Sequence, residues 1–597
     1  MKKALIILSL FFYFGVSYSQ EDMQLAMGYF NGGEYDKAEV LFDKLYKQRN
    51  SKFYFDYYLE CLVQQEKFSE AEKRVEKELK KNPNDLTFSV DLGYINKQQG
   101  NIDEAEKQYK YVIKNLPINA NKIIEVGNSF FRKKEYDWAE KTYVEGNELM
   151  NNQFMQNLAN VYAAQRKFEG MIESYLDYAN SDYSKLPNVK TTFESYMNND
   201  VNDEFTDILQ RVLLTRIQKG NNEVYEELLV WFYIKKGEFL NAYIYGKALD
   251  KRKNENGVRV FRIGELAFEN EDYSTANKAF SYVVEKGVAY PYFFKARFAL
   301  LDVMYYQVEN GEITSEEEIK RLEENYLTVI NELGISQRTV DLIVDLAHLQ
   351  AFYLNKEQEA LTLLQDALNI VGLTDDFKAK FMLELGDIFV FAEMPWDAVL
   401  TYARIEEFFP SLEITDDAKF KKAKVYFYLG EFNWAKDQWD ILKGSPSKLI
   451  ANDAIYWSYF IDENLGYDSL QIGLKKYVRA DLYFYQHNYD AAILTADTII
   501  RDFSSEPVVP QTFYLKYEVY EQTKEYQKAA MNLEAIVEDY SYAMFADKAL
   551  FELAELYDYK LDNKEKAADC YKKILFDFQG SLYSEPSRTR YRELSGL

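Results

Sequence analysis

The sequence predicts an all-α fold, an α-solenoid in which helix-turn-helix repeats stack one on the next. Three observations predict it: apolar residues recur with helical spacing, the pattern repeats every 34 residues, and the composition favours packed helices. The chain has 597 residues, 47% of them hydrophobic, with only 25 Gly and 10 Pro. Such a length exceeds one globular core, so a repeat array or several domains are expected.

The stretch Asn84–Pro117 is the clearest repeat. Its first half is an apolar-periodic run that Gly100 interrupts, and its second half carries one apolar stripe. Pro117 cannot continue a helix and ends the unit. The residues of the stripe are Ile102, Ala105, Tyr109, Val112 and Ile113.

Small and aromatic residues return at the same places in neighbouring repeats. The matches at a spacing of 34 are Gly93 with Gly127, Ala71 with Ala105 and Ala139, Tyr109 with Tyr143, and Pro83 with Pro117. A small residue lets two helices lie close together, and the aromatic residue fills the space between repeats. This pattern resembles the tetratricopeptide repeat family. The resemblance implies an α-solenoid of such repeats, with partner proteins or peptides bound along the first helices.

The turns carry the second signature of the resemblance. A polar or Gly-containing pair is followed by an aromatic residue and, three positions later, by a small residue. Nine aromatic residues occupy this place, at the predicted start of a second helix. They are Tyr35, Phe68, Tyr136, Phe168, Phe239, Tyr273, Phe432, Tyr489 and Tyr526.

The repeats divide the chain into predicted segments. They are a signal peptide (1–19), N-terminal repeats (20–179), an irregular helical connection (180–222), central repeats (223–371), and longer-period repeats with a capping helix (372–597). In the last segment the spacing lengthens, since Ala398 and Ala435 are 37 residues apart. The 57 residues from Ala435 to Ala492 predict an additional helix near 453–463. This segment resembles the repeats of bacterial envelope-assembly proteins of the same family.

The N-terminus reads as a targeting signal. Lys2 and Lys3 precede the apolar run Ala4–Val16, and Ser17–Ser19 resembles a cleavage site before Gln20. The alternative is an uncleaved anchor, but the run is too short to span a bilayer. No Cys follows the run, so a lipoprotein anchor is not encoded. We expect a periplasmic or exported protein with no transmembrane segment in the mature chain.

Composition narrows the classes of partner and chemistry. The formal charge of -26 and the pI near 4.8 argue against nucleic acid and anionic lipid as partners. The two histidines, His348 and His487, lack a second His or Cys at ligand spacing, and no catalytic motif appears. The sequence predicts no catalytic residues, no metal site and no cofactor. Cys61 and Cys570 are expected to be unpaired structural residues.

The longer-period repeats contain the candidate partner site. The helical register places Phe427, Tyr428, Phe484 and Tyr485 on the inner face, flanked by Asp481 and Glu518. Rigid rings offer large contact area, and the acids favour an extended segment carrying Lys or Arg. The competing interpretation is that these rings pack between repeats.

Two function classes follow. The first is an exported, non-enzymatic scaffold that binds partner proteins or peptides in assembly, secretion or surface machinery of the cell envelope. The second is a catalytic or small-ligand periplasmic protein, such as a glycan-processing factor, that uses acidic residues of the groove. The scarcity of His and Cys favours the scaffold.

Signal cleavage gives the first testable prediction. We expect the mature chain to begin near Gln20, because the small residues Ser17 and Ser19 fit a cleavage site. Intact-mass measurement of protein from the native envelope checks it. A mass that includes 1–19 would contradict it.

Overall fold

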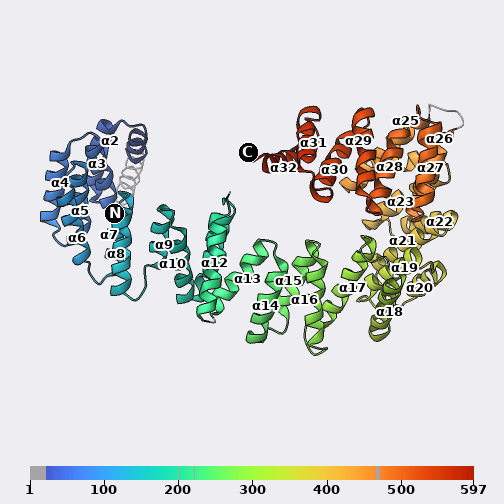
Figure 1. Cartoon of the computed structure of the whole chain (residues 1–597), viewed down its shortest axis with the longest axis horizontal. Helices are drawn as coiled ribbons and strands as arrows, with labels where there is room; N and C mark the ends of the chain where they lie inside the picture. Colours follow the sequence, from blue (N-terminus) through green and yellow to red (C-terminus); the bar gives the residue numbers. More distant parts are fainter. Residues whose placement is uncertain (1–21, 201, 221, 466–470, 597) are drawn as a thin grey trace, which may run out of the picture. The chain divides into compact units, whose positions relative to one another are not determined.

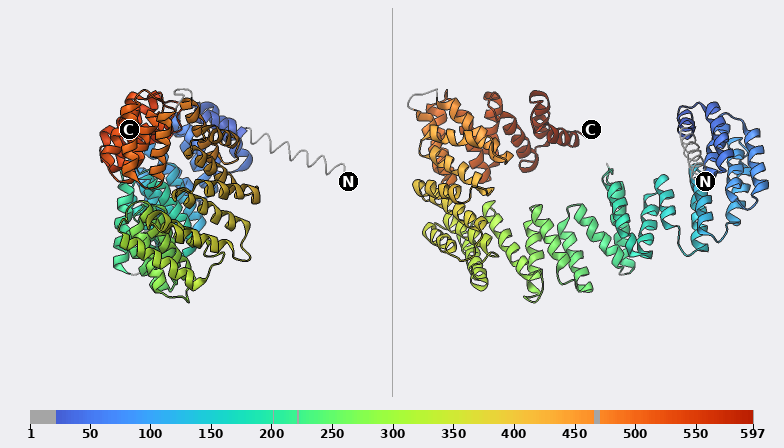
Figure 2. Two further views of the ribbon diagram at one scale, coloured as in Figure 1. Left: turned by 90° about the vertical axis from the view of Figure 1, so that its right-hand side faces the viewer. Right: turned by 180° about the vertical axis from the view of Figure 1, so that it is seen from behind.

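The computed structural model describes residues 22–200, 202–220, 222–465 and 471–596, and the predicted signal peptide 1–19 lies outside them. The chain forms two compact units, an N-terminal unit (1–254) and a C-terminal unit (255–597). All regular structure in the described residues is helical (Figures 1 and 2). The predicted all-α fold of helix-turn-helix repeats is confirmed.

The N-terminal unit is a row of helical hairpins that starts with helix 22–31 (Figure 1). Its helices are α2 (Tyr35–Arg49), α3 (Lys52–Gln64), α4 (Phe68–Lys81), α5 (Leu86–Gln98), α6 (Ile102–Lys114), α7 (Ala120–Arg132), α8 (Tyr136–Leu149), α9 (Met155–Ala164), α10 (Phe168–Ser181), the 3₁₀ turn η1 (Tyr183–Lys185), α11 (Leu186–Met197), α12 (Glu204–Lys219), α13 (Glu223–Lys235) and α14 (Phe239–Lys253).

The C-terminal unit continues the same arrangement. Its helices are α15 (Val258–Glu269), α16 (Tyr273–Glu285), α17 (Phe293–Glu309), α18 (Glu316–Leu333), α19 (Val340–Tyr353), α20 (Glu357–Leu368), α21 (Asp375–Phe391), α22 (Pro395–Phe408), α23 (Ile414–Tyr428), α24 (Phe432–Leu442), α25 (Lys448–Leu465), α26 (Ile472–Tyr485), α27 (Tyr489–Asp502), α28 (Val509–Gln522), α29 (Tyr526–Asp539), α30 (Ala546–Glu555), the π turn η2 (Leu556–Lys560), α31 (Lys564–Asp577) and α32 (Ser584–Ser595). The additional helix predicted between Ala435 and Ala492 is α25.

The turn signature has a backbone cause. Each of the nine predicted aromatic residues is the first residue of a second helix, and the residue two positions earlier has positive φ. At the first turn this residue is Gly33, whose N–H bonds to Phe30 while the Glu34 N–H reaches Tyr29 at 2.9 Å. This pair of backbone hydrogen bonds is typical of a helix whose C-terminus is followed by a residue in the left-handed conformation. The chain can then reverse at once into the second helix.

The two helices of a hairpin meet where a small residue faces an aromatic ring. A Cβ atom on Gly93 would lie 2.3 Å from the Tyr109 ring, and one on Gly127 would lie 2.3 Å from the Tyr143 ring. Both tyrosines are 1% exposed. The glycines are therefore required by space, because any side chain would collide with a fixed ring.

This crossing gives a second prediction. Gly127→Ala should overpack the contact with Tyr143 and lower the local free energy of unfolding by roughly 1–3 kcal/mol. Hydrogen exchange of α7 and α8 in the full chain measures it. The control is Gly28→Ala, since Gly28 lies exposed in helix 22–31 with nothing within 4 Å of the added Cβ. If the amides of α7 were equally protected from hydrogen exchange in Gly127→Ala and Gly28→Ala, the Tyr143 ring would have moved aside without cost, and the prediction would be wrong.

Candidate functional site

In the C-terminal unit, successive first helices exchange side-chain contacts along one side. We call this side the first-helix face, and α17, α19, α21, α23, α26, α28 and α30 form it. Its ion pairs join neighbouring first helices, with His348 Nδ1 2.9 Å from Glu384 and Lys424 Nζ 2.8 Å from Asp481. The other two pairs are Lys380 with Asp341 and Lys421 with Asp387.

Burial and charge compete in these pairs. Burial lowers the pKa of Lys424, and the nearby Asp481 only partly offsets it. For Lys421 the result is opposite, because the charge of Asp387 outweighs burial and raises the pKa. Burial also opposes the charge on His348, but its hydrogen bond to Glu384 raises the pKa overall. Neighbouring helices thus partly shield Lys424 and His348 from water, whereas the pair of Lys380 and Asp341 is exposed.

The C-terminal unit owes this enclosure to contacts between distant hairpins. Tyr485 donates a hydrogen bond to the Asp387 carbonyl at 3.2 Å, and His487 packs 5.2 Å from the Tyr353 ring. Further along, Gln522 donates to the Glu309 carbonyl at 3.0 Å. The turns after α26 and α28 thus pack against earlier hairpins of the same unit.

The structure brings four of the six predicted partner residues, Tyr428, Asp481, Tyr485 and Glu518, into one neighbourhood. Tyr428 and Tyr485 are half-buried with ring centres 6.4 Å apart, and burial, then the charge of Asp481, raises the pKa of Tyr428. Glu518 is half-buried nearby on α28, with no hydrogen bond or ion pair to a described residue. Burial, and secondarily Asp481, raises the pKa of Glu518 to about 8.

The other two aromatic residues lie elsewhere. Phe427 is fully buried between α23, α24 and α25, with its ring 5.3 Å from Trp457 and 5.7 Å from Phe432. Phe484 is half-buried and turns toward Tyr489 on α27, at 6.1 Å. Their rings belong to packing between helices. Partner binding by the six residues stays a prediction.

Sequence reasoning missed Asp387, which lies at the centre of this neighbourhood. It accepts hydrogen bonds from Tyr402 at 2.6 Å and from Lys421 at 2.5 Å. The signal was present, because Gly386 and Tyr402 have the same spacing of 16 as Gly93 and Tyr109. The residue after this glycine faces the first-helix side.

On the corresponding side of the N-terminal unit, a buried acidic side chain pairs with lysines of neighbouring hairpins. Asp91 on α5 is 0% exposed and lies 2.8 Å from Lys52 on α3 and 2.7 Å from Lys133, which directly follows α7. Burial alone would raise the pKa of Asp91, but the charges of Lys133 and Lys52 lower it overall. Asp91 therefore connects three successive first helices.

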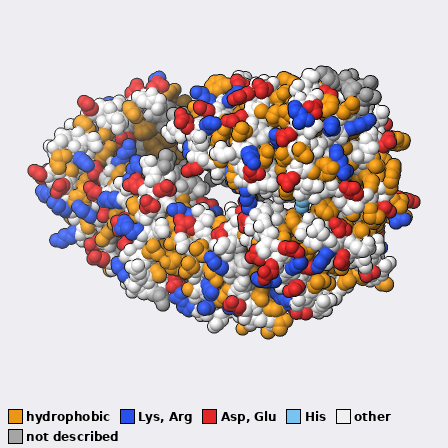
Figure 3. Space-filling model, turned by 45° about the vertical axis from the view of Figure 1, so that its right-hand side comes forward, with side chains coloured by type: hydrophobic (Ala, Val, Ile, Leu, Met, Phe, Trp, Pro, Cys, Tyr) orange, Lys and Arg blue, Asp and Glu red, His pale blue; other side chains and the backbone are white. Residues whose placement is uncertain are grey.

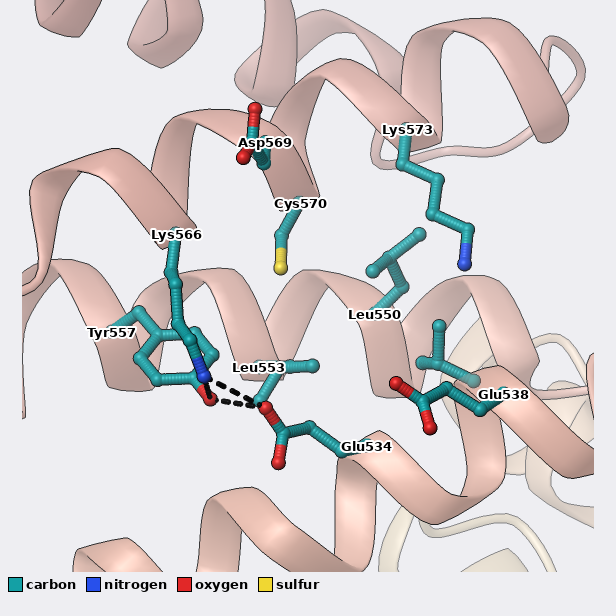
Figure 4. A pocket seen from close by; sticks show the side chains of 10 residues that line it. Glu534, Glu538, Leu550, Leu553, Tyr557, Lys566, Asp569, Cys570 and Lys573 are labelled. Atoms are coloured by element: carbon teal, nitrogen blue, oxygen red, sulfur yellow. Dashed lines mark hydrogen bonds and ion pairs between the residues drawn. The ribbon is translucent and has the colours of Figure 1, made fainter.

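A separate pocket of about 200 Å³ lies between α29, α30 and α31 (Figure 4). Lys566 lies 2.8 Å from the Tyr557 hydroxyl and 3.1 Å from Glu534, and the Cys570 thiol points into the space beside Leu553. Burial raises the pKa of Cys570 to about 11 and that of Cys61 to about 12, so both free thiols are protonated at neutral pH.

Among the described residues, no group of three His, Cys, Asp or Glu side chains is placed to hold a metal ion. In the same part of the chain, every helix is too short or too polar to cross a membrane. Acidic and basic side chains are interspersed over the face seen in Figure 3.

Comparison with known proteins agrees with the hairpin geometry. The family model described as tetratricopeptide repeat matches residues 62–120, which include the crossing of Gly93 and Tyr109. Residues 62–120 thus match the tetratricopeptide repeat family. None of the curated proteins compared with this repeat protein matches it.

Three solved structures are similar to this chain. Naa15/Naa10 bound to HypK-THB has 13% identity and a TM-score of 0.26, covering 97% of this chain and 96% of that one. A tetratricopeptide repeat protein from Parabacteroides merdae has 15% identity and a TM-score of 0.22, covering 50% and 98%. Yeast Tom70 has 11% identity and a TM-score of 0.28, covering 75% and 96%.

The buried Asp91 gives a third prediction. Asp91→Asn should destabilise α3, α5 and α7 by roughly 3–5 kcal/mol, because Lys52 and Lys133 lose the fully buried one of their two carboxylate partners and keep only Asp56. Hydrogen exchange in the full chain measures it. The control Glu106→Gln breaks an exposed pair with Lys110 and should change little.

The same residue gives the pH dependence. Since the folded-state pKa of Asp91 is lowered, its contribution is complete above the unfolded value near 4 and is lost as pH falls through the folded value. As the pH falls, the amides of α3, α5 and α7 should lose less protection from hydrogen exchange in Asp91→Asn than in the wild-type protein. An identical acid profile in both proteins would contradict the assignment.

Proposed function

We propose that this chain is an exported, non-enzymatic scaffold that binds partner proteins or peptides in the bacterial cell envelope. The observation that carries the proposal is the first-helix face of the C-terminal unit, where half-buried aromatic rings and carboxylates lie together. Tyr428 and Tyr485 provide rigid contact area. Glu518 provides a half-buried carboxylate that forms no ion pair with a described residue, although the charges of Lys548 and Lys424 act on it.

The charges on this face indicate the kind of partner. Its carboxylates outnumber its lysines, and an acidic surface attracts segments that carry Lys or Arg. Long-range attraction acts mainly on the association rate, so added salt should slow association more than it speeds dissociation. The predicted signal peptide supports an envelope location for this partner.

Site-specific photo-crosslinking tests the proposal. A photoreactive phenylalanine replaces Glu521 or Glu555, which are exposed on the first helices α28 and α30. The matched control replaces Met531, which is 66% exposed on the second helix α29. We expect adducts with the same partner from both first-helix positions and none from Met531.

The outcome separates binding along the first helices from other modes. The crosslinked chain is used at full length, and each variant must keep the wild-type helical signal by circular dichroism. Adducts only at Met531 would place partners on the second helices. Absence of adducts at all three positions in envelope preparations would refute the scaffold proposal.

A further inference from the structure

The only two histidines of the sequence lie at one contact between distant hairpins of the C-terminal unit. His348 belongs to the first helix α19, and its ring stacks on Phe352 with the ring centres 4.0 Å apart. His487 belongs to the turn after α26, and its ring centre lies 6.0 Å from that of the same Phe352. One phenylalanine is thus a neighbour of both imidazole rings.

Aromatic rings from three helices surround His487. Besides Phe352, Tyr353 of α19 lies 5.2 Å from the imidazole and Phe391 of α21 lies 6.2 Å from it. On its own hairpin, Tyr489 of α27 stacks on it at 5.8 Å. A half-buried imidazole among these rings has little water to solvate a positive charge.

The backbone of this turn does not require a histidine. His487 has a φ of 57°, and it occupies the left-handed position that Gly33 takes in the first turn. At the same position, other turns have the long polar side chains of Glu66, Lys134, Arg166, Glu271 and Lys524. The particular contribution of His487 is therefore its ring, which packs on α19 and α21.

Two further interactions join the same segments. Gln486 donates a hydrogen bond to the Phe391 carbonyl at 3.1 Å, and the Arg479 guanidinium lies 3.5 Å from the Glu393 carboxylate. The pair of Arg479 and Glu393 is exposed and contributes little. Burial of the rings around His487 therefore matters more to the stability of this contact.

The charged groups on the surrounding elements do not offset a charge on His487. Their carboxylates are Glu384 (paired with His348), Asp387 (with Lys421), Glu393 (with Arg479), Glu309 of α17 (which acts on His348 and Tyr353) and the exposed Asp490 of α27. In the described part of the chain, none of them forms an ion pair with His487. The phenols of Tyr353 and Tyr489 are neutral, because burial raises their pKa values.

We propose that the contact of His487 with α19 and α21, which we call the His487 latch, holds these hairpins together while the imidazole is neutral and releases them when it is protonated. Release would uncover Tyr485, whose ring lies 5.8 Å from Phe352 and whose hydroxyl donates to the Asp387 carbonyl. Mild acid would thereby regulate access to the first-helix face. The latch needs no partner, whereas its effect on access rests on the proposed scaffold function.

The sign of the pH dependence follows from the two histidines. Burial, then the charge of His348, lowers the pKa of His487, so the latched state favours the neutral ring. The latch is therefore complete above the ordinary imidazole value near 6.5 and weakens as the pH falls from there through the latched-state value. For His348, the hydrogen bond to Glu384 outweighs burial and raises the pKa, so this ring is charged before His487 is protonated.

Nuclear magnetic resonance of the full chain with isotope-labelled histidine measures both pKa values, because two histidines give two imidazole signals. His348→Gln identifies the remaining signal. We expect His487 to titrate below about 6.5 and below His348, and to move toward about 6.5 in His348→Gln. A value for His487 at or above about 6.5 in the wild type would mean that the rings stabilise the imidazolium, and it would overturn the latch.

Hydrogen exchange measures the release. Between about pH 7.5 and about pH 5.5, the protection factors at the end of α19 should fall by about two- to tenfold in the wild type, the upper limit being set by a released-state pKa near 6.5. His487→Phe keeps a neutral ring and should not show this fall. Protection of α5 in the N-terminal unit is the internal control, because the lowered pKa of Asp91 keeps it charged throughout this range.

The comparison of the two proteins isolates His487 from other groups that titrate. Buried acids such as Asp345 and Glu518 have raised pKa values, so acid favours their folded surroundings, and they do so equally in the wild type and the variant. His487→Gln is the second variant, because other turns accept long polar side chains at this φ. Each variant must keep the wild-type helical signal by circular dichroism.

The latch and the scaffold fail separately. An acid-induced loss of protection at α19 that is equal in the wild type and in either folded variant, or no loss in the wild type, would overturn the latch. Partner adducts at Glu521 and Glu555 at neutral pH test the scaffold without reference to His487. A scaffold without a latch, or a latch without a partner, would each be recognised.

Discussion

A tyrosine ring lying directly on a glycine backbone is the contact on which this structure depends. At Gly93, Gly127 and Gly386 the space for a Cβ atom is taken by the ring of a tyrosine on the next helix. The contact fixes the distance between the two helices of a hairpin. It also places the hydroxyls of Tyr143 and Tyr402 beside the first helix, where they donate hydrogen bonds to Asn128 and Asp387. Packing and the polarity of the first-helix face therefore have one origin.

Buried acidic side chains have different surroundings in the two units. In the N-terminal unit, Lys52 and Lys133 each pair with Asp91 and with Asp56, so two positive charges face two negative charges. In the C-terminal unit, burial raises the pKa values of Asp302 on α17, Asp345 on α19 and Glu518 on α28, and none of the three forms an ion pair with a described residue. Removal of one member of a buried pair is costly, because it leaves the other charge buried without compensation.

Local sequence determined much of the fold but less of the site. The turn residues and the glycine-tyrosine spacing could be read from the chain because both act within one hairpin. The site depends on rotation about a helix axis, and adjacent residues differ by about 100°. Phe427 thus lies in the core while Tyr428 reaches the first-helix side. The enclosure of this side, through Tyr485 on Asp387, arises from contacts 98 residues apart that no periodicity encodes.

The hydrogen bond from Gln522 to Glu309 joins residues 213 positions apart, and this separation has a consequence for synthesis. A ribosome adds roughly 5–20 residues per second, so α17 emerges about 10–40 s before the turn that packs on it. During that interval its hairpin can pack only on its neighbours in sequence. The enclosed arrangement is therefore completed late, as one of the last steps of chain maturation.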